Sequence, residues 1–233
     1  MDLNLERIGD VIVLDTGVGE KRFNPESVAA LNSALDDVMA IRDGGDQIAL
    51  VVTGSDKFFS NGIDLEWMFG DEAQASPDTI PDFLASMMGT WARILSLPIP
   101  TVAAINGHAF AGGAMYALSF DHVLMRADRG YWCVNEVLLQ MPLAAGMQAL
   151  LEAKLPAPTL RKAILTAHRF DGASAVAAGI ADEALDDADL RPRAIELAQS
   201  LAPTANPILG RLKEDLYAQT LAALRAGDVP TTF

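Results

Sequence analysis

The chain is poor in cysteine and in basic residues. Its 233 residues include one cysteine, Cys133, which cannot form an internal disulfide and supplies no cluster of metal ligands. We therefore expect a reducing compartment and no metal site. The 17 Lys and Arg stand against 31 Asp and Glu, a formal net charge of −14. Such a charge opposes nonspecific binding to nucleic acid and to anionic membranes, so neither is expected as a partner.

The chain also lacks an uncharged apolar run of transmembrane length. Its most apolar segment, residues 102–125, is interrupted by Asn106, His108 and Asp121. The first seven residues do not combine a basic stretch with an apolar run, and the last four, Pro-Thr-Thr-Phe, do not form a peroxisomal signal. We therefore expect a soluble, cytoplasmic protein.

Apolar residues make up 51% of the chain, enough to bury one large core. Strand patterns cover residues 3–7, 10–16, 48–53, 101–105, 121–126 and 131–134, and helical patterns begin at Asn24-Pro25, at residue 82 and after the glycines near residue 112. Residues 70–81 predict a mobile surface loop, and from about residue 147 the sequence is mostly helical. This order predicts an α/β core at residues 1–185 and a helical C-terminal region at 186–233.

Two glycine-containing segments follow predicted strands, at residues 58–64 and 106–113. The second opens a helix, whose first backbone N–H groups favour negative charge. If a backbone amide from the first segment faces them, the pair can hold an oxyanion as it forms. Either segment alone is weak evidence, because tight turns also require glycine.

A third segment, residues 131–139, contains one carboxylate, Glu136, among uncharged and largely apolar residues. Burial there would raise the pKa of Glu136 and make it a stronger base. The alternative is that the carboxylate only caps the turn that follows.

These motifs carry a family resemblance: Phe58-Phe-Ser-Asn-Gly-Ile-Asp-Leu65, the segment from Asn106 through Gly113, and Asp128-Arg-Gly130 with Asn135-Glu136-Val137. Over nearly its full length the chain resembles the crotonase, or enoyl-CoA hydratase/isomerase, superfamily. In these motifs it is especially similar to monofunctional 3,2-enoyl-CoA isomerases of the plant peroxisomal type. The resemblance implies an α/β fold of the ClpP/crotonase type, a spiral of ββα units with a helical C-terminal region, assembled as a homotrimer or as a hexamer (dimer of trimers).

The resemblance also implies an activity, a shift of the double bond of a 3-enoyl-CoA to the 2-trans position during fatty acid β-oxidation. The amides of Ile63 and Gly112 would hold the thioester oxygen of a dienolate, and Glu136 would move a proton from C2 to C4. The acyl-CoA thioester is the substrate, and no cofactor or metal is implied. The substrate-binding residues implied are Arg22, Ser60, Asn61, Gly62, Asp64, Leu65 and Gly113.

Two other activities stay open. An enoyl-CoA hydratase activates water with two glutamates, but the position that matches the other glutamate is Met115 here, which favours isomerisation. A catalytically silent homologue would bind acyl-CoA without reaction. The length of the acyl chain is not predicted, because five apolar residues could line a pocket for the acyl tail, although most are expected to fill the core: Trp67, Met68, Met87, Met88 and Trp91.

Overall fold

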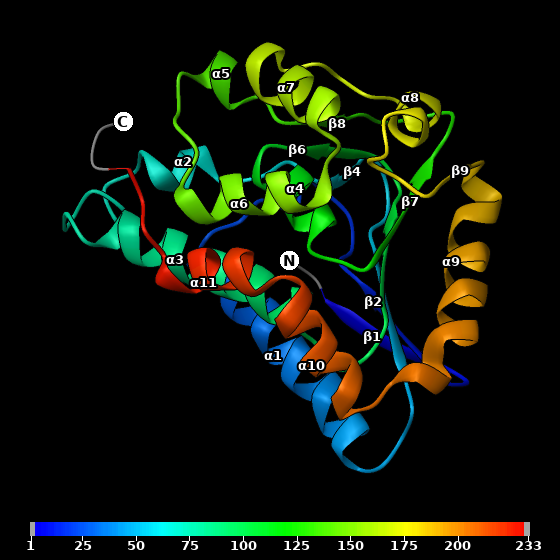
Figure 1. The fold of residues 1–233 in the computed structure, drawn as a ribbon. Helices are drawn as coiled ribbons and strands as arrows, with labels where there is room; N and C mark the ends of the chain where they lie inside the picture. Colours follow the sequence, from blue (N-terminus) through cyan, green and yellow to red (C-terminus); the bar gives the residue numbers. More distant parts are fainter. Residues whose placement is uncertain (1–2, 231–233) are drawn as a thin grey trace.

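The computed structural model describes residues 3–230, and pairs of strands followed by helices dominate its first two thirds (Figure 1). Residues 1–2 and 231–233, part of the terminal segments on which the expected location depends, lie outside the described residues. The successive units are β1 (Asn4–Ile8), β2 (Val11–Asp15) and α1 (Pro25–Asp43); β3 (Ala49–Thr53), β4 (Phe58–Ser60), α2 (Leu65–Met68) and α3 (Thr79–Leu95); β5 (Thr101–Ile105), β6 (His108–Phe110) and α4 (Gly112–Leu118); and β7 (His122–Arg126), β8 (Trp132–Cys133) and α5 (Glu136–Leu139). The predicted order of ββα units is confirmed.

The rest of the described chain is helical apart from one short strand. Its elements are α6 (Ala145–Lys154), α7 (Ala157–Thr166), α8 (Gly172–Ala177), β9 (Glu183–Leu185), α9 (Asp187–Leu201), a 3-10 turn (Ala202–Thr204), α10 (Pro207–Leu216) and α11 (Ala218–Ala226). Strand β9 was not predicted, because three residues that pair only with β7 form no recognisable apolar run. The proposed boundary between residues 185 and 186 falls between β9 and α9 and stays a prediction.

The strands form two sheets. The larger has the order β1-β2-β3-β5-β7-β9 and is parallel except for the β1–β2 hairpin, whereas the smaller, β4-β6-β8, is wholly parallel. Strands β3 and β5 are buried at every residue, as expected for parallel strands with both faces covered. In Figure 1, α9 stands alone along one face of the larger sheet, and the other helices lie on the opposite side.

The local signals for α1 act as predicted. The Asn24 side chain accepts a hydrogen bond from the backbone N–H of Ser27, the Ser27 hydroxyl accepts one from the backbone N–H of Asn24, and Pro25 occupies the first helical position. Helix α3 begins at Thr79, three residues before the predicted start, so the loop before it is shorter than expected and contains the buried Ala73. Within residues 3–230, no helix combines the length and apolarity needed to span a bilayer.

Candidate active site

The smaller sheet brings the three candidate segments together. Strands β4, β6 and β8 are neighbours and parallel, so the loops that follow them leave the same edge of the sheet. Ile63 follows β4, Gly112 follows β6 and Glu136 follows β8. A parallel sheet therefore places residues that are far apart in sequence at one point, where they line a single cavity.

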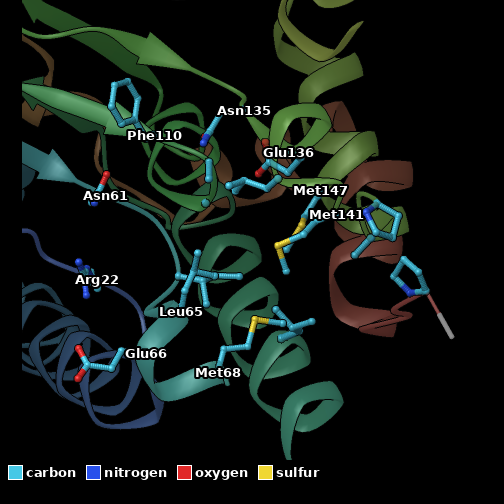
Figure 2. A pocket seen from close by; sticks show the side chains of 18 residues that line it. Arg22, Asn61, Leu65, Glu66, Met68, Phe110, Asn135, Glu136, Met141 and Met147 are labelled. Atoms are coloured by element: carbon cyan, nitrogen blue, oxygen red, sulfur yellow. The ribbon is translucent and has the colours of Figure 1, made fainter. Parts of the chain in front are cut away.

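The cavity has a volume of about 430 Å³ and a mostly apolar wall (Figure 2). Its lining includes six of the residues expected at the site, Arg22, Asn61, Ile63, Leu65, Gly112 and Glu136, together with Glu66, Met68, Leu84, Phe110, Ala111, Asn135, Leu139, Met141, Pro142, Ala144, Met147 and Pro230. The four other expected residues, Ser60, Gly62, Asp64 and Gly113, do not line it. Within residues 3–230, no group of three or more His, Cys, Asp and Glu side chains is arranged to hold a metal ion.

Two main-chain N–H groups at the cavity are unpaired. Among the described residues, neither the amide of Ile63 nor that of Gly112 donates a hydrogen bond to a protein acceptor. Gly62, at φ +81°, holds the two segments in contact, because a Cβ on Gly62 would lie 2.8 Å from the oxygen of Phe110 and 3.2 Å from the nitrogen of Gly112. The local backbone can therefore present two donors to the cavity.

Ala111, just before α4, has φ +50°, a conformation that is unfavourable for alanine. Its strained turn leads directly into the amide of Gly112. Sequence reasoning did not select Ala111, because nothing in the residue type signals a positive φ.

Ser60 and Gly113 set the spacing between the two segments from behind the cavity wall. The Ser60 hydroxyl donates to the carbonyl of Lys21 at 2.8 Å and accepts from the amide of Gly62 at 3.2 Å. A Cβ on Gly113 would lie 2.3 Å from the carbonyl oxygen of Ser60, so only glycine fits there. Both residues act on the geometry of the loop.

Glu136, the first residue of α5, carries a poorly solvated carboxylate. Its Oε2 atom is buried and has no hydrogen-bond partner among the described residues. Burial raises the pKa of Glu136 to about 7. Asn135 Oδ1, at the same cavity, is also buried and unpartnered. Asn135 was named only within the motif Asn135-Glu136-Val137 and not as a site residue; it occupies the N-cap position of α5, but its side chain makes no capping hydrogen bond.

The polar side of the cavity contains Arg22 and Asn61. Arg22 Nε donates to Glu20 Oε2 at 2.7 Å, and its Nη1 lies 3.5 Å from Asp64 Oδ1. Asp64 also caps α2 by accepting from the amide of Trp67. The structure therefore places Asp64 beside the polar wall, with its carboxylate engaged by protein groups.

Of the five candidate residues for the acyl pocket, one lines the cavity and four pack in or against the core. Met68 lines the cavity, whereas Met87, Met88 and Trp91 are fully buried in the core and Trp67 packs partly buried against it. The expectation that most of them fill the core is confirmed. Met115 is also fully buried in the core and does not line the cavity, so no carboxylate enters the cavity from that position of α4.

Comparisons with known proteins agree on one family. Residues 20–228 match the model of the Enoyl-CoA hydratase/isomerase family. Enoyl-CoA delta isomerase 3 of Arabidopsis thaliana is 35% identical over 92% of both chains, and the peroxisomal enoyl-CoA delta isomerase 2 of that plant is 33% identical over 94% of both. The crystal structure of a probable enoyl-CoA hydratase from Mycobacterium tuberculosis H37Rv superposes with a TM-score of 0.86 at 30% identity, covering 97% of this chain and 92% of that one.

Proposed function

The chain belongs to the enoyl-CoA hydratase/isomerase family, and on that basis we propose that it is an isomerase that converts 3-enoyl-CoA to 2-trans-enoyl-CoA. The observation that carries the proposal is the poorly solvated carboxylate of Glu136 in a cavity with two unpaired backbone amides. A base and an oxyanion site are the two elements that proton abstraction next to a thioester carbonyl requires.

In the proposed reaction the substrate carbonyl accepts hydrogen bonds from the amides of Ile63 and Gly112. The Glu136 carboxylate removes a proton from C2, and the two amides stabilise the negative oxygen of the resulting dienolate. The protonated Glu136 then returns a proton to C4, which leaves the double bond between C2 and C3. A pKa near 7 suits this role, because the group must both accept and release the proton. The reaction moves one proton and uses no redox step.

Hydration is the second candidate, because the similar mycobacterial protein is named a probable hydratase in one solved structure and an isomerase in another. Water attack at C3 requires groups that hold and activate water. Glu136 is available for this, but the position of the second glutamate of hydratases is the buried Met115. We therefore rank hydration below isomerisation.

A test that separates these activities supplies 3-hexenoyl-CoA and crotonyl-CoA to the wild type and to Glu136→Gln, with products followed by mass and by absorbance of the conjugated thioester. Isomerisation of 3-hexenoyl-CoA that is lost in the variant is the expected result. Hydration of crotonyl-CoA as fast as isomerisation supports a hydratase instead. Binding of both thioesters without reaction identifies a silent homologue, and unchanged activity of Glu136→Gln excludes Glu136 as the base.

We also propose that the chain assembles as a homotrimer or as a dimer of trimers. Helix α10 supports this, because the side chains of Ile208, Leu212 and Leu216 recur along one face and are 66%, 60% and 72% exposed. Light scattering measures the mass directly, and Leu212→Glu is expected to shift it toward the monomer. A monomeric wild type contradicts the assembly and leaves the proposed chemistry unaffected. The cytoplasmic location stays a prediction.

A further inference from the structure

A hydrogen-bonded network lies behind the polar side of the cavity, centred on Glu20, which is not itself a lining residue. Glu20 Oε2 accepts from Arg22 Nε at 2.7 Å and from Asn61 Nδ2 at 2.8 Å. The backbone carbonyl of Glu20 also accepts from the backbone amide of Asn61 at 2.8 Å. Figure 2 shows Arg22 and Asn61 on the same side of the cavity, across from Met141 and Met147. One carboxylate thus contacts two residues of the cavity wall.

This contact fixes the orientation of the Asn61 amide. The hydrogen bond from Asn61 and the neighbouring Arg22 lower the pKa of Glu20, so the side chain is an ionised carboxylate that can only accept hydrogen bonds. Asn61 must therefore turn its NH₂ group toward Glu20 and its carbonyl oxygen away. Within residues 3–230, no protein group donates to Asn61 Oδ1. The cavity wall thus carries an open acceptor with a defined direction.

The same network holds Arg22 between two hollows. Glu20 and Asp64 engage its guanidinium, and Arg22 lines both the cavity and an adjoining open hollow of about 530 Å³ whose lining also includes Glu20 and Asp64. Beyond its sulfur, an acyl-CoA thioester has an arm with secondary amides and then phosphates. A carbonyl acceptor followed by a cation is the order of groups that such an arm can contact.

We infer that Glu20 is a positioning residue for the carrier arm of the substrate, because it directs the Asn61 carbonyl to accept a hydrogen bond from an amide N–H of that arm and keeps Arg22 beside it. This inference rests on the proposed acyl-CoA substrate. It makes Glu20 a determinant of thioester affinity that acts through Asn61. The proton transfer at Glu136 does not involve it.

The test uses hexanoyl-pantetheine, which has the amides of the arm but no diphosphate and no double bond to isomerise, so that binding is measured by calorimetry without catalysis. Glu20→Ala and Asn61→Ala are each expected to raise the Kd between about two-fold and twelve-fold, the net effect of one hydrogen bond. The double variant is expected to bind no more weakly than the weaker single variant, because both changes remove the same contact. Glu20→Gln presents a donor as well as an acceptor to Asn61 and no longer fixes the direction of its amide, so it is expected to raise the Kd by less than Glu20→Ala does.

Two controls separate this role from general damage. The Glu20 side chain is 41% exposed, so its truncation leaves the core intact. Glu26→Ala removes another exposed carboxylate from the same open hollow and is expected to leave the Kd unchanged. With 3-hexenoyl-pantetheine, Glu20→Ala is expected to raise KM and to leave kcat at the wild-type value.

Three results overturn the inference: additive effects in the double variant, an unchanged Kd in Glu20→Ala, or no binding of hexanoyl-pantetheine by the wild type. Failure of the proposed isomerase is a different result, since it appears as absent turnover of 3-hexenoyl thioesters while the binding measurements still decide the role of Glu20.

Discussion

Replacing Glu136 with glutamine is expected to stabilise the folded protein in a pH-dependent way while it abolishes isomerisation. Burial raises the pKa of Glu136 from an ordinary 4.5 to about 7, a difference of about 2.5 pH units. Each unit corresponds to about 1.4 kcal/mol, so the ionised carboxylate destabilises the fold by about 3 kcal/mol above pH 7. Glutamine has nearly the same shape and carries no charge.

Whether stability rises or falls with pH follows from the direction in which folding moves the pKa of Glu136. Because the pKa is higher in the folded state, the folded protein binds more protons than the unfolded chain between pH 4.5 and 7, and stability falls as the pH rises through that range. The variant does not titrate at this position. Its advantage over the wild type is expected to be about 1.4 kcal/mol at pH 5.5 and to grow by about 2 kcal/mol by pH 9.

Urea unfolding at pH 5.5 and pH 9 measures this difference, with fluorescence of the fully buried Trp91 and Trp132 as the signal. Subtracting the free energy of unfolding of the wild type from that of the variant at each pH removes the contribution of the other groups that titrate in this range. Glu66→Gln is the matched control, because Glu66 lines the same cavity but is exposed, and it is expected to change stability by less than about 0.5 kcal/mol at either pH. A difference for Glu136→Gln that is the same at both pH values would refute the assignment of a poorly solvated carboxylate.

Three further outcomes are expected. The kcat/KM of isomerisation should rise with pH to a plateau above about 7 and fall about tenfold per unit well below it, because only ionised Glu136 accepts the C2 proton; a profile that is flat from pH 5.5 to 9 contradicts this role. Gly62→Ala should lower both kcat/KM and the melting temperature, because φ at Gly62 is +81° and the new Cβ would lie 2.8 Å from a backbone oxygen. The control is Gly89→Ala, whose new Cβ points into open space within α3. It should stabilise the protein by about 0.5–1 kcal/mol and leave activity unchanged. Lys213→Met should destabilise the protein by about 3 kcal/mol in urea unfolding, because the buried Lys213 ammonium donates to Asp121 at 2.6 Å; a loss below 1 kcal/mol shows that Asp121 needs no such partner.

The parts of the fold and site that sequence reasoning predicted are those with local causes. The Asn24-Pro25 signal starts α1, and the apolar runs form β3 and β5. The isolated Glu136 has a raised pKa because its neighbours in sequence offer no positive partner and the folded chain encloses it. The helix start and the apolar runs depend on a few adjacent residues, whereas the apolar neighbours of Glu136 only indicate its burial and the fold completes it.

The parts that could not be predicted depend on contacts between distant segments. Met147 and Pro230 line the cavity because α6 and the chain after α11 pack beside it, which no short pattern encodes. Glu20 looks like any exposed acidic residue in a chain with 31 of them, and only the fold brings it to Asn61. The positive φ of Ala111 runs against the preference of alanine, so it follows from the surrounding structure.

The two donors at the cavity belong to the peptide backbone, and this gives the site an unequal tolerance to mutation. Any residue except proline at position 63 supplies the same N–H group, and a Cβ at position 112 would come no closer than 3.7 Å to its neighbours, an ordinary contact. No main-chain group can replace the carboxylate at position 136. The two donors can therefore survive many substitutions around the cavity, whereas replacement of residue 136 by any residue without a carboxylate is expected to end the proposed acid–base chemistry.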